Sequence, residues 1–589
     1  MRVHYPRTPH LPWSPGAAAD DVRAGSLSAL AGREVVVTEK LDGENTTLYR
    51  DGLHARSLDS AHHPSRAWVK ALQGRIGAAI PPGWRICGEN LFARHSVDYR
   101  ELAGYFYGFS VWDEADRCLD WDATVRFLRG LGVPVPRVRW RGVYDERALR
   151  ALRVAAACEE GYVVRTVEGF PGAEFGTRVA KWVRPGHVQT GTHWMHAAVV
   201  PNGLGPQAAL WAVRAGAEPE LPRLIAVLGI ADAVGRAGEA AAEAAAELDL
   251  LGRTGDARLT GVLAAALADR PRAELAARSA PVLGLPLARR VTDLIGLHPT
   301  LHQTCPDEER RRGLGTLALS ADLGALHAVA RAVLAGRTDD AAARGAREQV
   351  DWSALHAEEA GLLDPDPFAA PRAELRHAFA GLDPLAADRC WAQAREGLAH
   401  GRLAGAADAV AATWRWREGR FPHLVQLVGP AGSGKSTFAA ALPGPVTRIS
   451  LDDLRTARGS RSDQRANAEV LREGLEQLDA ALAAAREGGT VVWDATSLTH
   501  QQRAKVHAVA RRRDALHTQV VTLVDEAELL RRNATRAHPV PAEMLTAQLH
   551  RYSPPYPGDA HRTRYLAADG TVADALGGLA DPDPEGGGA

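Results

Sequence analysis

A glycine-rich loop between an apolar strand and a helix is the feature that most restricts how this chain can fold. Residues 429–436 read GPAGSGKS, directly after the apolar run HLVQLV and before a helix-forming run that begins at Thr437. In this G-x-x-x-x-G-K-[ST] pattern, glycines let backbone N–H groups converge on phosphate oxygens at the start of a helix. The pattern predicts a strand–loop–helix unit of a parallel sheet that binds a nucleoside triphosphate. Lys435 would contact the β- and γ-phosphates, Ser436 would ligate magnesium, and the other nucleotide-binding positions would be Gly429, Gly432, Ser433, Gly434 and Thr437.

Lysine is rare in this chain: only five positions carry it, although Lys and Arg together number 70. A chain that uses arginine almost everywhere keeps lysine where a neutral amine or a compact charge is needed. Three of the five, Lys40, Lys181 and Lys435, lie in motifs suited to phosphate. The other two are Lys70 and Lys505.

Charge and cysteine content restrict the class of protein. The 70 basic and 71 acidic residues nearly cancel, so a nucleic acid would have to be bound by local patches. Five scattered cysteines without C-x-x-C spacing argue against a disulfide framework and a zinc cluster, and favour a reducing cytoplasm. With no apolar leader and no run of about 18 apolar residues, we expect neither export nor a membrane span.

The chain divides into three regions with different secondary-structure patterns in the sequence. Up to residue 205, short β-rich runs alternate with turn signals, which predicts an α+β domain built on antiparallel sheet. Residues 206–415 show helical periodicity broken by Gly and Pro, which predicts an all-α middle domain. Residues 416–570 alternate strands, the third expected at 518–524, with helices, which predicts an α/β domain with a parallel sheet. The remainder, 571–589, ends in a Gly-, Asp- and Pro-rich run and is expected to be disordered.

Further polar groups follow the glycine-rich loop. SLDDLR at 450–455 places a carboxylate where it can accept the proton of an attacking hydroxyl, WDATSL follows at 493–498, and RNATR at 532–536. Over about residues 421–566 this set resembles the 5′-hydroxyl polynucleotide kinases of phage and bacterial end-repair systems. The family often has glycine where this chain has Ala537. The resemblance implies Asp452 as general base, Arg455 on the 3′-phosphate of the RNA terminus, Asp494 orienting the acceptor, Arg536 on the transferring phosphate and Arg532 nearby.

A second succession of motifs occupies the N-terminal region. EKLDGEN at 39–45 is followed by RS at 56–57, GEN at 88–90, YGF at 107–109, EGYVVR at 160–165 and AKWVR at 180–184. In this order the motifs resemble covalent nucleotidyltransferases, most closely the nick-sealing RNA ligases, over about residues 30–200. In such enzymes a neutral lysine attacks the α-phosphorus of ATP, so nearby cations and metal are expected to depress its pKa.

The second resemblance implies roles for individual residues. Lys40 would be the nucleophile, and Lys181 would offset the charge of the α-phosphate. The other implied nucleotide contacts are Glu39 to the adenine amino group, Glu89 to the ribose, Phe109 stacked on adenine, Glu160 to the metal or the lysine, and Asn45, Arg56 and Arg184. Two positions depart from the usual pattern: Ser110 follows Phe109 where many such ligases carry Asp, and the last motif is K-x-x-R where many carry K-x-K.

The middle region offers little chemistry. His298-Pro-Thr300 and His302-Gln-Thr304 are similar to the paired H-x-T of 2H phosphoesterases, but those pairs lie on separate strands far apart in sequence. A helical scaffold or an RNA-binding platform is the favoured reading, and the arginine clusters there are more typical of a solvated face.

Together the motifs predict an RNA repair enzyme, with ATP and Mg²⁺ (or Mn²⁺) as cofactors. It would phosphorylate 5′-hydroxyl RNA ends with a nucleoside triphosphate and seal 3′-hydroxyl and 5′-phosphate ends through a lysyl-adenylate and an adenylylated RNA. The partners would be broken RNA, with transfer RNA as one candidate, and a separate 3′-end-healing phosphatase or phosphodiesterase. RNA is favoured because 187–196 is expected to lead into helix, whereas DNA ligases and capping guanylyltransferases continue into an OB barrel. The alternatives are DNA end repair, or an RNA-binding sensor with a degenerate ligase fold and an NTPase switch.

Overall fold

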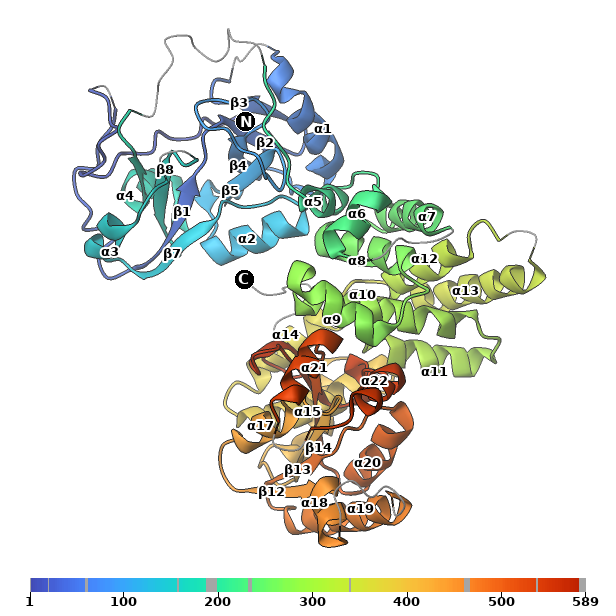
Figure 1. Ribbon diagram of the computed structural model, residues 1–589. Coiled ribbons are helices and arrows are strands. Elements are labelled where there is room, and N and C mark those ends of the chain that lie inside the picture. Colours follow the sequence, from blue (N-terminus) through green and yellow to red (C-terminus); the bar gives the residue numbers. More distant parts are fainter. Residues whose placement is uncertain are drawn as a thin grey trace. The chain divides into compact units, whose positions relative to one another are not determined.

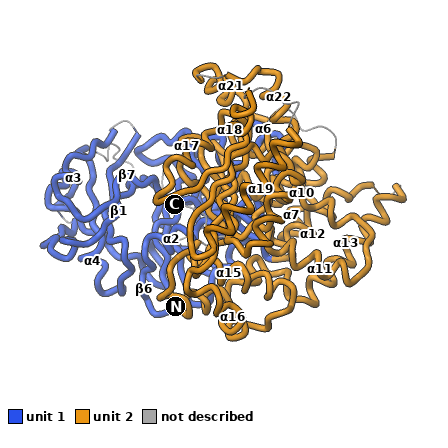
Figure 2. The backbone as a smooth tube through the Cα atoms, turned by 90° about the horizontal axis from the view of Figure 1, so that it is seen from below, with its two compact units in different colours: residues 1–227, 252–259, 589 blue, residues 228–251, 260–588 orange. Residues whose placement is uncertain are grey.

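In the computed structural model, two compact units divide the chain. Residues 1–227 and 252–259 form the N-terminal unit, and 228–251 and 260–588 form the C-terminal unit (Figure 2). The structure describes residues 2–19, 21–58, 62–155, 158–186, 199–230, 236–337, 340–459, 467–536 and 539–581. The segment 187–196, on which the choice between RNA and DNA rested, lies outside these residues, as does Ala537.

The N-terminal unit is built on two antiparallel sheets (Figure 1). One has the order β10-β8-β1-β7 and the other β3-β2-β4-β5-β6-β9. The strands are β1 Glu34–Lys40, β2 Glu44–Tyr49, β3 Gly52–Ala55, β4 Arg85–Asn90, β5 Phe106–Trp112, β6 Arg117–Cys118, β7 Val138–Val143, β8 Gly161–Thr166, β9 Phe170–Pro171 and β10 Val179–Val183. The helices are α1 Ala67–Ile76, α2 Trp121–Gly130, α3 Glu146–Ala151, α4 Phe175–Arg178, α5 Ala208–Arg214 and α6 Leu221–Leu228.

Strand β1 is buried on both faces, which explains its continuous apolar run. Val35 and Val37 pack into one hydrophobic cluster, and Val36 packs into another with Trp121 of α2. Helix α2 begins where the Asp120 side chain accepts a hydrogen bond from the N–H of Ala123. Packing on both faces of β1 therefore fixes the position of its last residue, Lys40.

The C-terminal unit holds a six-stranded sheet of order β12-β13-β11-β14-β15-β16, parallel except for the last strand. Its strands are β11 His423–Val428, β12 Val446–Ser450, β13 Thr490–Asp494, β14 Leu516–Thr522, β15 Arg562–Leu566 and β16 Val572–Leu576. Helices α19 and α20 pack on one face through Leu478, Leu482 and Val506, and α17 packs on the other through Ala439. The bounds of these helices are α17 Lys435–Ala440, α18 Leu451–Ala457, α19 Asn467–Ala484, α20 His500–Arg512, α21 Glu526–Ala534 and α22 Ala542–Arg551.

The same unit contains most of the helical middle region. Its helices are α7 Ala237–Leu250, α9 Arg272–Leu283, α10 Leu285–Leu297, α11 Asp307–Ala318, α12 Leu323–Leu334, α13 Ala341–Glu359, α14 Ala369–Ala378, α15 Pro384–Ala399 and α16 Ala406–Ala412, while α8 Gly255–Ala266 crosses the boundary between the units. The buried guanidinium of Arg289 in α10 donates to Asp574 of β16 at 2.7 Å, and that of Arg562 in β15 donates to Asp388 of α15 at 2.6 Å. Helices α10 and α15 therefore contact the β15–β16 edge of the sheet.

Two expectations for this unit were wrong in detail. The third strand ends at Thr522, because Leu523 and Val524 pack into hydrophobic clusters beyond the ladder. The expected disordered tail contains β16, which pairs with β15 from Thr563↔Leu576 onward, so residues 571–581 are ordered and 582–589 lie outside the described residues.

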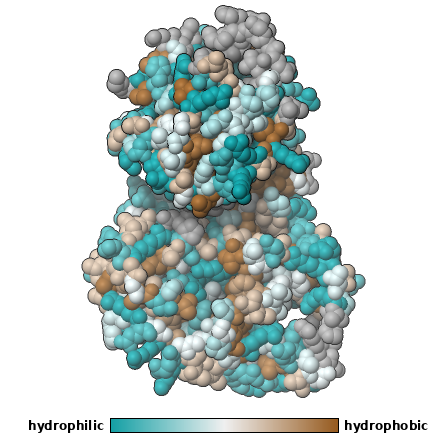
Figure 3. Space-filling view, turned by 90° about the vertical axis from the view of Figure 1, so that its left-hand side faces the viewer, coloured by the Kyte–Doolittle hydropathy of each residue, from teal (hydrophilic) through white to brown (hydrophobic). Residues whose placement is uncertain are grey.

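One face of the molecule and the hydropathy of the described helices bear on whether the chain could cross a membrane. Hydrophobic residues lie in small groups among hydrophilic ones on the face in Figure 3. Within the described ranges, no single helix has the length and apolar character to cross a bilayer, and only the bent pair α11 and α12 meets those criteria together.

Candidate functional site

Lys40 ends β1 directly opposite Gly161 of β8, so strand register brings it beside Glu160. Its Nζ donates to Glu160 Oε2 at 2.5 Å. A side chain at Gly161 would collide with the backbone of Trp182, since a Cβ there would lie 1.9 Å from that carbonyl oxygen. Glycine therefore allows the close approach of β10 and positions Lys181 near Lys40.

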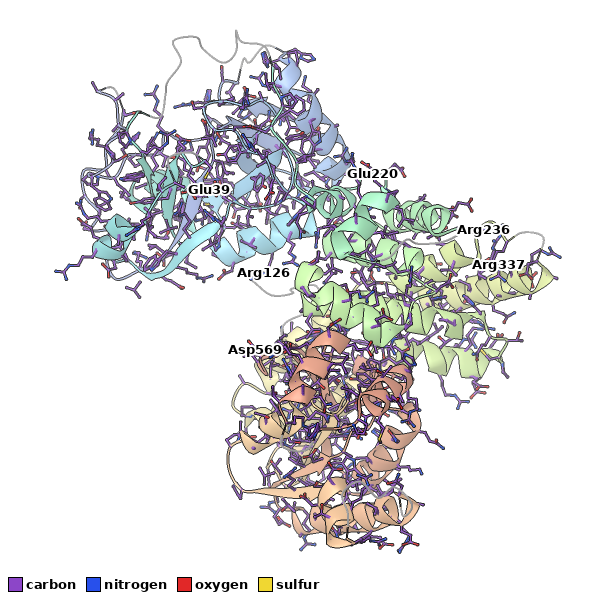
Figure 4. The ribbon with its side chains drawn as sticks, viewed as in Figure 1. Glu39, Arg126, Glu220, Arg236, Arg337 and Asp569 are labelled. Atoms are coloured by element: carbon purple, nitrogen blue, oxygen red, sulfur yellow. The ribbon has the colours of Figure 1, made fainter. Side chains whose placement is uncertain are left out.

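A cavity of about 1090 Å³ opens around Lys40. Its lining includes eight of the nine ligase positions named from the sequence: Glu39, Lys40, Asn45, Arg56, Glu89, Phe109, Glu160 and Lys181. Glu39 is labelled in Figure 4 at the β1 end of this region. The ninth, Arg184, is not among the lining residues; its Nε donates to the Glu159 carbonyl at 3.0 Å and its backbone N–H to the Glu160 carbonyl at 3.1 Å. Arg184 thus holds the backbone of Glu159 and Glu160, just before β8.

The charges around Lys40 act against the expected depression of its pKa. Burial disfavours its ammonium form, but the carboxylates of Glu160, Glu89 and Asp42 outweigh burial and raise the pKa of Lys40. Burial lowers the pKa of Lys181, and the Lys40 charge lowers it further. Among the protein's own groups the pKa of Lys40 is therefore raised, because three acidic residues surround the amine.

Glu89 is the most perturbed carboxyl group of this cavity. Burial raises its pKa to about 8, against the opposing charge of Lys40 and with Glu160 adding to the rise. Its Oε1 accepts a hydrogen bond from the Gly43 N–H at 3.2 Å. Carboxyl groups perturbed by burial and a charged partner are frequent at functional sites.

The structure adds a detail to Asn45, which the sequence had named, and adds Tyr5, which it had not. Asn45 has a buried carbonyl oxygen, Oδ1, without a hydrogen-bond partner among the described residues, as expected for a group that faces a ligand. Tyr5 lines the cavity from an N-terminal segment that the motif analysis did not use. No motif marks Tyr5, because only the folded chain brings it to β5.

In the C-terminal unit, the glycine-rich loop follows β11 and leads into α17, as predicted. Gly429, Gly432 and Gly434 have φ values of 143°, 82° and 98°, which other residues rarely adopt. Lys435 Nζ donates to the Pro430 carbonyl at 2.6 Å, and burial lowers the pKa of Lys435 to about 8. Ser433 is buried and accepts a hydrogen bond from Thr522 at 2.6 Å, so its side chain holds the loop, while Ser436 and Thr437 are exposed.

Asp494 lies at the end of β13 beside the loop. Ser436 Oγ donates to Asp494 Oδ2 at 3.2 Å, and Arg448 of β12 donates to the same oxygen through Nε at 3.0 Å and Nη2 at 2.5 Å. A hydroxyl and a carboxylate at this spacing fit the oxygen ligands that Mg²⁺ prefers. Arg448 was not found from the sequence, since a lone arginine in a short strand carries no motif.

The remaining kinase positions lie around the loop. Asp452 and Arg455 of α18 form an ion pair of 2.8 Å, and the charges of Asp452 and Arg536 both act on Lys435. Arg536 has a buried Nη1 without a hydrogen-bond partner in the described part of the chain, 3.8 Å from where a Gly432 Cβ would lie. Arg532 instead pairs with Glu528 at 2.7 Å and donates to the Ala568 carbonyl at 2.6 Å. Arg536 therefore faces the phosphate loop more directly than Arg532.

The histidines of the middle region do not form the arrangement of a 2H phosphoesterase. His298 and His302 lie in one 3-10 helix, η5, with ring centroids 5.2 Å apart, and Thr304 beyond it is exposed. Burial lowers the pKa of His298 to about 4, which disfavours a general acid role near neutral pH. Across the described ranges, no group of three or more His, Cys, Asp or Glu side chains is placed to hold a metal ion.

Two segments of the chain match models of known protein families. Residues 33–183 match the family model described as RNA ligase, and residues 424–555 match the one described as AAA domain. Comparison with curated proteins gave no significant match.

Solved structures with similarity are distant. A chain of the Pnkp1/Rnl/Hen1 RNA repair complex is 20% identical with a TM-score of 0.20, over 23% of this chain and 49% of that chain. The RNA ligase of Naegleria gruberi with pyrophosphate is 16% identical with a TM-score of 0.22, over 31% and 61%. A gluconokinase from Sinorhizobium meliloti 1021 is 22% identical with a TM-score of 0.19, over 25% and 83%. The chain thus spans about half of the repair-complex chain and about three fifths of the ligase. Residues 33–183 are thus similar to the RNA ligase family, and residues 424–555 are similar to the AAA domain family.

Proposed function

We propose that this protein repairs broken RNA by phosphorylating 5′-hydroxyl ends and sealing them to 3′-hydroxyl ends. The observation that carries the proposal is the placement of Lys40 Nζ in a large cavity, 2.5 Å from Glu160 and near Lys181, within the segment that matches RNA ligases. We assign the step that prepares a 5′-phosphate to the phosphate-binding loop of the C-terminal unit, within the segment that matches AAA domains.

The sealing reaction has three steps. The Lys40 amine, once deprotonated, attacks the α-phosphorus of ATP, forming a phosphoramide bond to AMP as pyrophosphate leaves. A 5′-phosphate oxygen of the RNA then takes AMP from Lys40, which returns to the free amine. The RNA 3′-hydroxyl finally attacks that 5′-phosphorus, and AMP leaves as the phosphodiester forms. Lys181 offsets charge on the α-phosphate, while Glu39, Asn45, Arg56, Glu89 and Phe109 contact the nucleoside.

In the kinase reaction, Asp452 accepts the proton of the 5′-hydroxyl as that oxygen attacks the γ-phosphorus. Lys435 and Arg536 stabilise negative charge on the transferring phosphate, and Asp494 orients the acceptor. Arg455, 2.8 Å from Asp452, binds the 3′-phosphate of the terminal nucleotide. Mg²⁺ or Mn²⁺, when bound, neutralises phosphate charge, and the residues suited to hold it are Ser436 with Asp494 in one site and Glu160 in the other.

The test uses the full chain, ATP and Mg²⁺ with a nicked RNA duplex bearing 5′-hydroxyl and 3′-hydroxyl at the break. We expect a protein mass increase of one AMP, a 5′-phosphorylated intermediate and a sealed strand. A DNA duplex of the same sequence tests the choice of RNA. ATP hydrolysis and RNA binding without the AMP adduct would instead indicate an RNA-sensing protein and would refute the repair activity.

A further inference from the structure

The cavity around Lys40 has two chemically different ends. One end carries the charged side chains Lys40, Lys181, Arg56 and Glu160. The other is a hydrophobic cluster in which Phe109, Val163 and Tyr5 pack against buried residues that include Phe175 and Val179. Phosphates fit the charged end, whereas a flat, weakly polar ring system fits the aromatic end.

Tyr5 is fixed in the aromatic end by three neighbours. Its ring meets Phe109 and Phe175 edge to face, with centroids 5.3 Å apart in both cases. The Ser110 side chain lies close to its hydroxyl and accepts a hydrogen bond from the Trp112 indole N–H at 3.1 Å. Ser110 is the position where many similar ligases carry Asp, so in this chain a neutral hydroxyl faces the tyrosine.

The segment that carries Tyr5, residues Val3–Leu11, is tied to both ends of the cavity. We call it the N-terminal strap. Near Tyr5, His4 Nδ1 lies 2.9 Å from the Arg56 carbonyl oxygen. Farther along, the Lys181 N–H donates to the Pro9 carbonyl at 2.9 Å, and the Leu11 N–H donates to the Lys181 carbonyl at 2.8 Å. The strap therefore joins the backbone of the phosphate-binding lysine to the aromatic end.

We propose that Tyr5 forms one wall of the base subsite and contacts the purine ring of the nucleotide whose phosphate reacts with Lys40. Tyr5 and Phe109 both line the cavity, and burial of a flat heterocycle among aromatic and aliphatic side chains is favourable. The strap connects this subsite to the backbone of Lys181. This inference rests on the proposed ligase function.

The experiment measures binding of α,β-methylene-ATP, which cannot transfer AMP because a carbon replaces the bridging oxygen. All proteins carry Lys435→Ala, so that the P-loop site contributes little to binding. Tyr5→Ala is compared with Tyr5→Phe, and Tyr144→Ala serves as control, since Tyr144 packs in a cluster away from the cavity. Circular dichroism and thermal melting establish that each variant is folded.

We expect Tyr5→Ala to raise the Kd for α,β-methylene-ATP about tenfold, and Tyr5→Phe, which keeps the ring, about two- to threefold. Tyr144→Ala should leave the Kd unchanged. Ser110→Ala should resemble Tyr5→Phe and provides the second variant if Tyr5→Ala does not fold. Unchanged binding by Tyr5→Ala would overturn the proposal, and so would tighter binding, which would show that Tyr5 occupies the base subsite and obstructs it.

The experiment distinguishes failure of the ligase assignment from failure of the proposed base contact. If the unsubstituted protein forms no AMP adduct while Tyr5→Ala still weakens binding of the analogue, the base contact stands and the ligase function falls. If the adduct forms normally and Tyr5→Ala binds as tightly as the parent protein, only the base contact falls.

Discussion

Lys40 and Glu160, 120 residues apart in sequence, are joined by a charged hydrogen bond of 2.5 Å where β1 and β8 pair. The acidic groups of Glu89 and Asp42 also raise the pKa of Lys40. The amine proposed to attack ATP is therefore protonated before reaction, and its proton must be removed for AMP transfer.

Lys40→Ala and Lys40→Arg should both abolish AMP transfer, because the position supplies an attacking amine and not only a charge. Mass spectrometry after incubation with ATP and Mg²⁺ measures the adduct. Lys70→Ala is the matched control, as Lys70 is exposed on α1 and outside the cavity. An adduct on Lys40→Arg would assign the nucleophile to another lysine.

The rate of AMP transfer should rise with pH, since the neighbouring carboxylates raise the Lys40 pKa and only the neutral amine attacks. Glu160→Gln removes one of those charges and should move the midpoint of the pH–rate profile to lower pH, even if the maximum rate falls. Single-turnover adenylylation between pH 6 and 10 tests this. A midpoint unchanged in Glu160→Gln would show that Glu160 does not control protonation of the amine.

Lys435→Ala and Asp452→Ala should each lower the rate of 5′-phosphorylation at least about a hundredfold. Both variants should still form the AMP adduct on Lys40, since each site lies within its own unit. Phosphate transfer from γ-labelled ATP to a 5′-hydroxyl oligonucleotide gives the rate. Lys505→Ala, an exposed lysine on α20, is the control. Loss of the adduct in Lys435→Ala would contradict separate active sites.

The C-terminal unit should lose stability as pH falls below about 6.5, the ordinary histidine pKa. Burial lowers the pKa of His517 to about 3, and its side chain lies 3.0 Å from Gln426. Because the unfolded chain then binds the proton more tightly, stability is present above pH 6.5 and falls by about 1.4 kcal/mol per pH unit between there and the folded pKa. His517→Gln should reduce this slope in urea unfolding followed at pH 7.5 and 5.5, whereas exposed His500→Gln should not.

A break that ends in a 2′,3′-cyclic phosphate should remain open, since His298 and His302 share one short helix and do not form a phosphoesterase pair. The assay compares two nicked RNAs that differ only in this 3′ end. Addition of a separate 3′-end-healing enzyme should restore sealing. Efficient sealing of the cyclic end by the pure protein would contradict this prediction and make His298 and His302 the first residues to substitute.

Local patterns gave much of the C-terminal site. The loop from Gly429 to Ser436 has a required backbone shape, so its spacing of glycines predicts both the structure and the phosphate chemistry. Asp494 was placed at the end of a predicted strand, but its contacts with Ser436 and Arg448 depend on the order of three strands. A motif cannot report which side chains a neighbouring strand presents.

In the N-terminal unit, the sequence by itself determined that acidic, aromatic and basic motifs follow Lys40 in a fixed order. Only the tertiary structure decided that Glu160 raises the pKa of Lys40, that Arg184 holds the backbone just before β8, and that Tyr5 enters the cavity. Local backbone preferences act over a few residues, whereas these relationships depend on strand register and on the packing of segments far apart in sequence.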